Sequence, residues 1–233
     1  MFSCEHFLFI GIFVALVVAG MYLCRNLTAA QTKKLLFWVA VCAGVVEAIK
    51  IALRILKGGG VDSWVPLYYC SLFLYAIWMC RSKAEWLSRM GYAYITMGGI
   101  MAAALFSLYP STSLAILPAW HPGSIHSLLY HAMMAFTGLL VLKKRLYIPH
   151  MKDALFYGAF VLTACVVGYF LNECWNSNCM FLHYAFKLPI LDDLLVYSHG
   201  LYMLVVVIVQ ASLMFWVNFG LYKLFTNKKG VSV

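Results

Sequence analysis

Seven long apolar runs divide the chain, and they restrict its fold more than any other feature of the sequence. The chain has 233 residues, of which 64% are hydrophobic and 11% are charged. A transmembrane helix needs about 17 or more apolar residues, and six of the runs approach or exceed that length. These features predict an all-α polytopic membrane protein, folded as a single helical bundle over residues 1–233. The predicted spans are 7–24, 35–56, 65–80, 90–109, 124–142, 153–172 and 194–221, of which 65–80 is the shortest and is expected to be tilted or broken.

The basic residues alternate between the predicted loops, which indicates how the bundle is oriented. Thirteen of the 17 lysines and arginines follow the first, third, fifth and seventh runs, whereas the opposite loops contain only Lys57 and Lys187. Basic residues collect in cytoplasmic loops. The pattern therefore predicts seven spans with the N-terminus outside and the C-terminus in the cytoplasm. It also accounts for the net charge of +9 without a nucleic-acid partner. The thirteen are Arg25, Lys33, Lys34, Arg81, Lys83, Arg89, Lys143, Lys144, Arg145, Lys152, Lys223, Lys228 and Lys229.

Three ionisable residues lie inside the second predicted span. Glu47, Lys50 and Arg54 are spaced by three and four residues, which puts them on one face of a helix, where they can pair. An ionisable group at membrane depth is expensive unless it is paired or faces an internal cavity. Two interpretations follow: a structural ion pair with Arg54 extending to the surface, or one wall of a polar cavity that opens outward.

A cysteine and a histidine are predicted at similar depths in two other spans. If the third helix begins at Pro66, where a first-turn proline needs no backbone donor, Cys70 lies roughly 6 Å below its outer end. His131 lies roughly 10 Å below the outer end of the fifth helix, on a face of small and polar residues that includes Ser127. His126 lies elsewhere around that helix. The sequence is therefore compatible with contact between Cys70 and His131 in the outer half of the bundle.

Further polar residues follow the sixth span. Cys174 and Cys179 are close enough in the chain for a disulfide on the outer face, and two separate thiols are an equally good interpretation. In the last predicted helix, Asp192, His199 and Gln210 fall on one face. This spacing weakly favours a polar cavity.

Several of these residues form a pattern that resembles a known family. The parts are the Pro66–Ser71 stretch (Pro-Leu-x-x-Cys-Ser), His131, and the Asn178–Leu182 block with the Lys187–Pro189 step after it. Their order and spacing resemble the YwaF family of bacterial membrane proteins and their eukaryotic relatives, the transmembrane protein 164 acyltransferases. The likeness extends over essentially the whole chain in number of spans. The sequence departs from the pattern at Cys179, which replaces the usual tyrosine, and in the residue that separates the lysine from the proline.

The resemblance implies an activity and assigns roles. In the transmembrane protein 164 relatives, a cysteine and a later histidine are regarded as the catalytic pair of an intramembrane acyltransferase. The androgen-induced hydrolases are similar in architecture and use threonine. The matching positions are Cys70 as the nucleophile that carries the acyl chain and His131 as its base. Ser71, Asn178 or Lys50 is expected to stabilise the oxyanion. This reading expects a lipid acyltransferase or thiol lipid hydrolase in a bacterial plasma membrane. Its substrates would be phospholipids or lysophospholipids, with no cofactor and no metal.

Two other functions fit the same residues. A transporter or lipid-binding protein would line its cavity with Glu47, Lys50, His131 and Asp192, because transporters also keep paired charges at membrane depth. A haem-binding redox protein would use His131 and His199.

The charge pattern predicts the topology directly. We expect a tag at the C-terminus to be cytoplasmic and a tag before Glu5 to be external. The reason is that most basic residues lie in the loops predicted on the same side of the membrane as the C-terminus. Protease protection of the two tags in sealed vesicles measures this. Finding both ends on the same side of the membrane would contradict the seven-span prediction.

Overall fold

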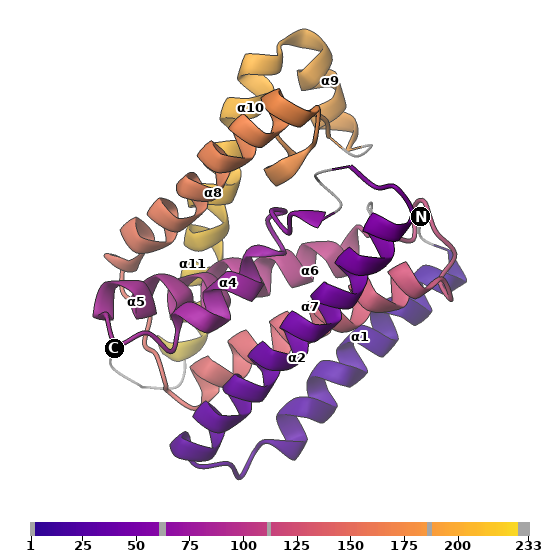
Figure 1. Ribbon diagram of the computed structural model, residues 1–233. Helices are drawn as coiled ribbons and strands as arrows, with labels where there is room; N and C mark the ends of the chain where they lie inside the picture. Colours follow the sequence, from indigo (N-terminus) through magenta and orange to yellow (C-terminus); the bar gives the residue numbers. More distant parts are fainter. Residues whose placement is uncertain (1–2, 61–63, 111–112, 186–187, 228–233) are drawn as a thin grey trace.

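The computed structural model describes residues 3–60, 64–110, 113–185 and 188–227, and these residues are mainly helical (Figure 1). The described residues contain no strand, so the predicted all-α class is confirmed. The elements are α1 (Cys4–Leu23), α2 (Ala29–Leu56), α4 (Leu72–Met79), α5 (Glu85–Ala93), η1 (Tyr94–Gly99), α6 (Ile100–Leu108), α7 (Pro122–Lys143), α8 (Asp153–Trp175), η2 (Cys179–Phe181), α9 (Pro189–Tyr197), α10 (His199–Ile208), η3 (Val209–Leu213) and α11 (Met214–Asn227). Here η1 and η3 are π-helical and η2 is a 3-10 turn.

Six helices among the described residues are long and apolar enough to cross a membrane. Two of them are composite, because η1 joins α5 to α6 and η3 joins α10 to α11 without a break in the helix. The molecule therefore has the architecture of an integral membrane protein. The six are Cys4–Leu23, Ala29–Leu56, Glu85–Leu108, Pro122–Lys143, Asp153–Trp175 and His199–Thr226.

The third predicted span differs from expectation. Its helix does not begin at Pro66 but at Leu72, and α4 is only eight residues, or about 12 Å, long. The residues before it are irregular, and the carbonyl of Leu67 accepts a hydrogen bond from the amide of Met180, 2.8 Å away, in the η2 turn. A contact distant in sequence thus replaces the expected first helical turn. The count of seven spanning helices is not confirmed.

The last predicted span is also interrupted. Ser198 is extended (φ −162°, ψ 116°) and separates α9 from α10. Its side chain accepts a hydrogen bond from the amide of Leu201, 3.3 Å away, and so caps the new helix. Asp192 therefore lies on α9, and His199 and Gln210 on the helix after the break. The prediction that these three residues share one helical face was wrong.

The loops that carry most of the basic residues lie at one end of the bundle. Lys144, after α7, donates to the carbonyls of Arg25 and Leu27 between α1 and α2, at 2.7 Å each. Arg89 of α5 is paired with Asp153 at the start of α8. Figure 1 shows that the segment through α4 carries the chain from the end where α2 finishes towards the end where α5 begins. The orientation of the two termini across the membrane stays a prediction.

Close packing at the centre of the bundle depends on a glycine of α7. This helix packs against α1, α2, η1 and α6. A Cβ atom added at Gly138 would lie 2.6 Å from both the Ile95 carbonyl oxygen and Ile100 Cγ1. Small residues allow helix backbones to approach in this way. Gly138 thus lets α7, which carries His131, pack directly against η1 and α6.

We expect Gly138→Ala to destabilise the folded bundle by about 1–3 kcal/mol, because the added methyl group overlaps a backbone carbonyl that cannot move aside easily. The midpoint of thermal unfolding in detergent measures this. Gly11→Ala is the control, since nothing lies within 4 Å of a Cβ at that position. Equal midpoints for the two variants would contradict this account of the packing.

Candidate functional site

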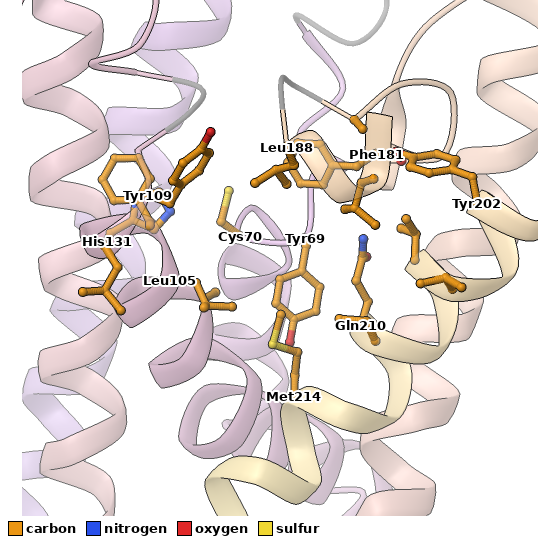
Figure 2. Close-up of a pocket in the computed structure, with 18 residues that line it drawn as sticks. Tyr69, Cys70, Leu105, Tyr109, His131, Phe181, Leu188, Tyr202, Gln210 and Met214 are labelled. Atoms are coloured by element: carbon orange, nitrogen blue, oxygen red, sulfur yellow. Dashed lines mark hydrogen bonds between the residues drawn. The ribbon is translucent and has the colours of Figure 1, made fainter. Parts of the chain in front are cut away.

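A cavity of about 380 Å³ lies inside the bundle (Figure 2). Its walls come from the segment before α4, from α6, α7, the η2–α9 segment and the composite helix α10–η3–α11. Most of the lining side chains are apolar, and both Cys70 and His131 are among the lining residues. The volume lies at the lower end of the range of about 300–1,000 Å³ that is usual for ligand sites. A cavity with these walls suits a largely apolar ligand.

The sequence predicted Cys70 one turn inside a helix. In the structure it lies immediately before one. It occupies a turn two residues before α4, and its side chain is partly exposed where it lines the cavity. The Ser71 hydroxyl is a hydrogen-bonding neighbour of the thiol. Among the described residues, the amides of Cys70 and Ser71 donate to no backbone carbonyl. The start of a helix carries a partial positive charge and stabilises anions. The start of α4 therefore offers backbone donors next to the sulfur.

His131 is held in a fixed orientation on α7. Its Nδ1 lies 2.7 Å from the carbonyl oxygen of Ser127, and because a carbonyl only accepts, Nδ1 must carry the proton. The ring also stacks on Phe106, with centroids 3.7 Å apart and planes within 6°. In the neutral ring, Nε2 then has the lone pair. The histidine is therefore prepared to act as a base through Nε2.

The structure brings Cys70 and His131 to the same cavity. Cys70 comes from the turn before α4 and His131 from α7, and Figure 2 shows them on neighbouring walls, close to Tyr109. General-base catalysis needs the base within hydrogen-bonding reach of the proton, directly or through one water. The cavity thus holds one thiol and one imidazole of the types that such a transfer uses.

The charged residues of α2 form a separate polar cluster next to the cavity. Lys50 makes an ion pair with Glu47, as their spacing predicted, and Glu47 is only 2% exposed. Nε2 of His126, on α7, lies 3.8 Å from the second carboxylate oxygen. Arg54 is exposed. None of these four residues lines the cavity. Of the two interpretations offered by the sequence, the structural ion pair describes Glu47 and Lys50. The contact with His126 was not predicted.

The remaining predicted site residues lie around the cavity rather than on its wall. Asn178 holds the loop after η2: its Oδ1 accepts from the amides of His183 and Tyr184, and its Nδ2 donates to the Tyr184 carbonyl. Nε2 of His199 is bonded to the Leu182 carbonyl. Asn178 is thus a structural residue, and its side chain is not directed at an oxyanion in the cavity.

Ser71 and Ser127 contact Cys70 and His131 as described, and Asp192 is half-buried on α9 without lining the cavity.

Several residues of the site were not singled out as such from the sequence. Gln210 lines the cavity, whereas the sequence pointed to it only as part of a polar face. Tyr69 also lines the cavity, and its hydroxyl lies 2.5 Å from that of Tyr157. In the sequence, the feature that came nearest to indicating Tyr69 was its position directly before Cys70, the candidate nucleophile. Cys174 and Cys179 are both thiols rather than a disulfide. Lys187 lies outside the described residues.

The comparisons with known proteins bear on the whole chain. The model of the TMEM164 family matches residues 1–220. The chain belongs to the TMEM164 family. This TMEM164-family protein matches no curated protein and no solved structure. The family resemblance read from Cys70, His131 and the block at 178–182 is thus confirmed, together with the membrane character of the chain.

The ion pair in α2 leads to a stability prediction. We expect Glu47→Ala to lower the unfolding free energy by about 1–3 kcal/mol, and Glu47→Gln to lower it less, because only alanine leaves Lys50 without a polar partner. Thermal unfolding of the purified variants measures the difference. Glu85→Gln is the control, since the carboxylate of Glu85 is 88% exposed. Wild-type stability of both Glu47 variants would show that the pair does not stabilise the bundle.

Proposed function

We propose that the protein is an intramembrane lipid acyltransferase that works through an acyl-cysteine intermediate, with Cys70 as nucleophile and His131 as base. One observation supports this above all others: a thiol at the start of a helix and an imidazole with its Nε2 lone pair available line the same apolar cavity. Membership of the TMEM164 family is consistent with it. A thiol lipid hydrolase would use the same residues, with water in place of the second lipid.

The first half of the reaction transfers the acyl chain to the protein. Nε2 of His131 takes the thiol proton, and the Cys70 sulfur attacks the ester carbonyl of a phospholipid. The carbon–oxygen bond of the ester then breaks. His131 returns its proton to the departing oxygen, so that a lysophospholipid leaves and a thioester remains on Cys70.

The second half transfers the chain to an acceptor. His131 removes the proton from a lipid hydroxyl, whose oxygen attacks the thioester carbonyl. The carbon–sulfur bond breaks, and the proton returns to the sulfur. Water would give a free fatty acid by the same steps. The apolar walls, with residues such as Leu105, Leu188 and Val206, favour a lipid acceptor over water.

The oxyanion that forms in both halves needs donors close to Cys70. The amides of Cys70 and Ser71 meet this need, because they precede α4 and donate to no backbone carbonyl among the described residues. The Ser71 hydroxyl is a third candidate. Of the donors expected from the sequence, Ser71 is retained. Asn178 and Lys50 are not, because their side chains bond to the η2 loop and to Glu47.

The site lies away from the loops that carry most of the basic residues, on the side where α2 ends and α7 begins. If these loops are cytoplasmic, as the sequence predicts, the reaction takes place in the outer half of the membrane.

The acyl-cysteine intermediate can be tested directly. We expect wild-type protein incubated with phospholipid to gain the mass of one acyl chain at Cys70 and to lose it on treatment with hydroxylamine, which cleaves thioesters. Intact-protein and peptide mass spectrometry measure this. Cys70→Ala should abolish both the adduct and the transfer of a labelled acyl chain in proteoliposomes, while expression stays near normal.

The controls separate catalysis from damage to the fold. Cys80→Ala should keep full activity, because Cys80 is buried away from the cavity. His131→Ala should be as inactive as Cys70→Ala, and the double variant no worse, since groups that act as one unit are not additive. Full transfer by Cys70→Ala would disprove the nucleophile. Normal lipid binding in all variants without any adduct would favour the transporter or lipid-binding alternative.

A further inference from the structure

Tyr94 is a buried tyrosine that bonds to the backbone directly before Cys70 and has no part in the proposed reaction so far. It lies in the π-helical segment η1, is 0% exposed, and does not line the cavity. Its hydroxyl donates a hydrogen bond to the carbonyl oxygen of Tyr69. Turns of π-helix within α-helices are often found at functional sites. The bond therefore connects the composite helix α5–η1–α6 to the turn that carries the thiol.

The Tyr69 carbonyl and the Cys70 amide belong to one peptide unit. The described residues contain no cis peptide bond, and in a planar trans unit the C=O and the N–H point in opposite directions. A bond that holds the carbonyl therefore also sets the direction of the Cys70 N–H. That amide donates to no backbone carbonyl among the described residues and is a hydrogen-bonding neighbour of the Cys70 sulfur itself. A chain of contacts thus runs from the Tyr94 hydroxyl through one peptide unit to the sulfur.

Tyr94 is the main donor to this carbonyl and is held firmly in place. Within the described part of the chain, the other donor to the Tyr69 carbonyl is the Leu72 amide, at 3.3 Å, and it is shared with the Tyr68 carbonyl at 3.2 Å. The Tyr94 ring packs edge-on against Phe160 and Tyr69, with centroids 5.5 Å and 5.6 Å away. Loss of the Tyr94 hydroxyl would therefore leave the carbonyl with one long, divided bond.

A carbonyl that accepts a hydrogen bond makes the amide of the same peptide unit a stronger donor. Such cooperative strengthening is roughly 10–30% per bond. An N–H beside the sulfur interacts more strongly with a thiolate than with a thiol, and also with the oxyanion that forms next to it. The effect of Tyr94 should therefore be larger for the charged states of the reaction than for the resting thiol.

We propose that Tyr94 is a positioning residue: its hydroxyl orients and polarises the 69–70 peptide, so that the Cys70 amide stabilises the thiolate and then the oxyanion. Tyr94 acts through the backbone and contacts neither the sulfur nor the lipid. The inference deepens the proposed function and rests on it for the role of Cys70 as nucleophile. It adds to the reaction a residue of η1, an element outside the cavity wall.

The first test measures the reactivity of the Cys70 thiol without any lipid substrate. We expect Tyr94→Phe, which removes one oxygen atom, to slow alkylation of Cys70 by iodoacetamide about threefold, since the thiolate fraction falls and the greater nucleophilicity of the remaining thiolate offsets part of the loss. The neighbouring ionisable groups Lys50, Glu47 and Tyr130 are the same in both proteins. Peptide mass spectrometry in detergent follows Cys70 separately, with the exposed Cys174 as the internal reference.

The second test measures acyl transfer in proteoliposomes. We expect kcat of Tyr94→Phe to fall about tenfold, less than the roughly 10²–10³-fold loss that follows removal of an oxyanion donor. KM should stay within about twofold of the wild-type value, because the cavity wall is unchanged and only the chemical step is affected. A merely structural role would not separate kcat from KM in this way.

Thr96→Val is the matched control. Thr96 belongs to the same segment η1, is 0% exposed, donates to the Tyr92 carbonyl at 2.7 Å and does not line the cavity. Its loss should change neither the alkylation of Cys70 nor kcat. In a further variant, 3-fluorotyrosine at position 94 keeps the ring and makes the hydroxyl a stronger donor, so Cys70 should react faster than in the wild type. This variant decides the question if Tyr94→Phe does not fold.

The outcomes separate this inference from the proposed reaction. Wild-type alkylation of Cys70 in Tyr94→Phe, or slower alkylation in the fluorotyrosine variant, overturns the role of Tyr94. An equal loss of activity in Thr96→Val would also overturn it, because general damage to η1 would then explain the result. Absence of an acyl adduct at Cys70 in the wild type overturns the proposed reaction instead, and the alkylation rates report on Tyr94 independently of it.

Discussion

The hydrogen bond from the Met180 amide to the Leu67 carbonyl supports the whole site. The interior of a bilayer offers no water to irregular backbone, so such backbone must be satisfied by the protein itself. The chain before α4 is irregular, and this contact of 2.8 Å satisfies part of it. The Met180 carbonyl in turn accepts from Gln210 Nε2. The turn that presents Cys70 is thereby connected through η2 to the composite helix on the far side of the cavity.

The η2 turn itself is held by the end of α8. Asn172 Oδ1 accepts from the Cys179 amide at 2.7 Å and from the Ser177 hydroxyl at 2.9 Å, and its Nδ2 donates to the Cys179 carbonyl. A Cβ atom added at Gly168 would lie 3.3 Å from Cys179, so α8 can pack closely on the turn. Asn178 fixes the chain that follows. The block at 178–182, which carries part of the family resemblance, thus supports the turn that carries Cys70.

The sequence predicted the long helices well because each is encoded locally by a continuous apolar run. It failed at Pro66 and Ser198 for a physical reason. A proline suits the first turn of a helix, so nothing near Pro66 revealed that Leu67 would bond to a turn more than a hundred residues later. The predicted depth of Cys70 assumed a helix that begins at Pro66, which does not form, although Cys70 and His131 both line the cavity. His126 lies close to Glu47 because α7 packs against α2. The pattern within a single helix does not predict which faces of two helices will pack together.

The ion pair in α2 also bears on the choice between transfer and hydrolysis in the proposed reaction. A thioester at Cys70 survives until a lipid acceptor arrives only if little water reaches it. An unpaired Lys50 at this depth would draw water towards the site, because a charge that lacks a partner must be hydrated. Glu47 binds Lys50 and lies close to His126 between α2 and α7, so the charges are satisfied outside the cavity wall. The cavity can then remain apolar around the thioester, and a hydroxyl that enters with a lipid becomes the best-placed nucleophile.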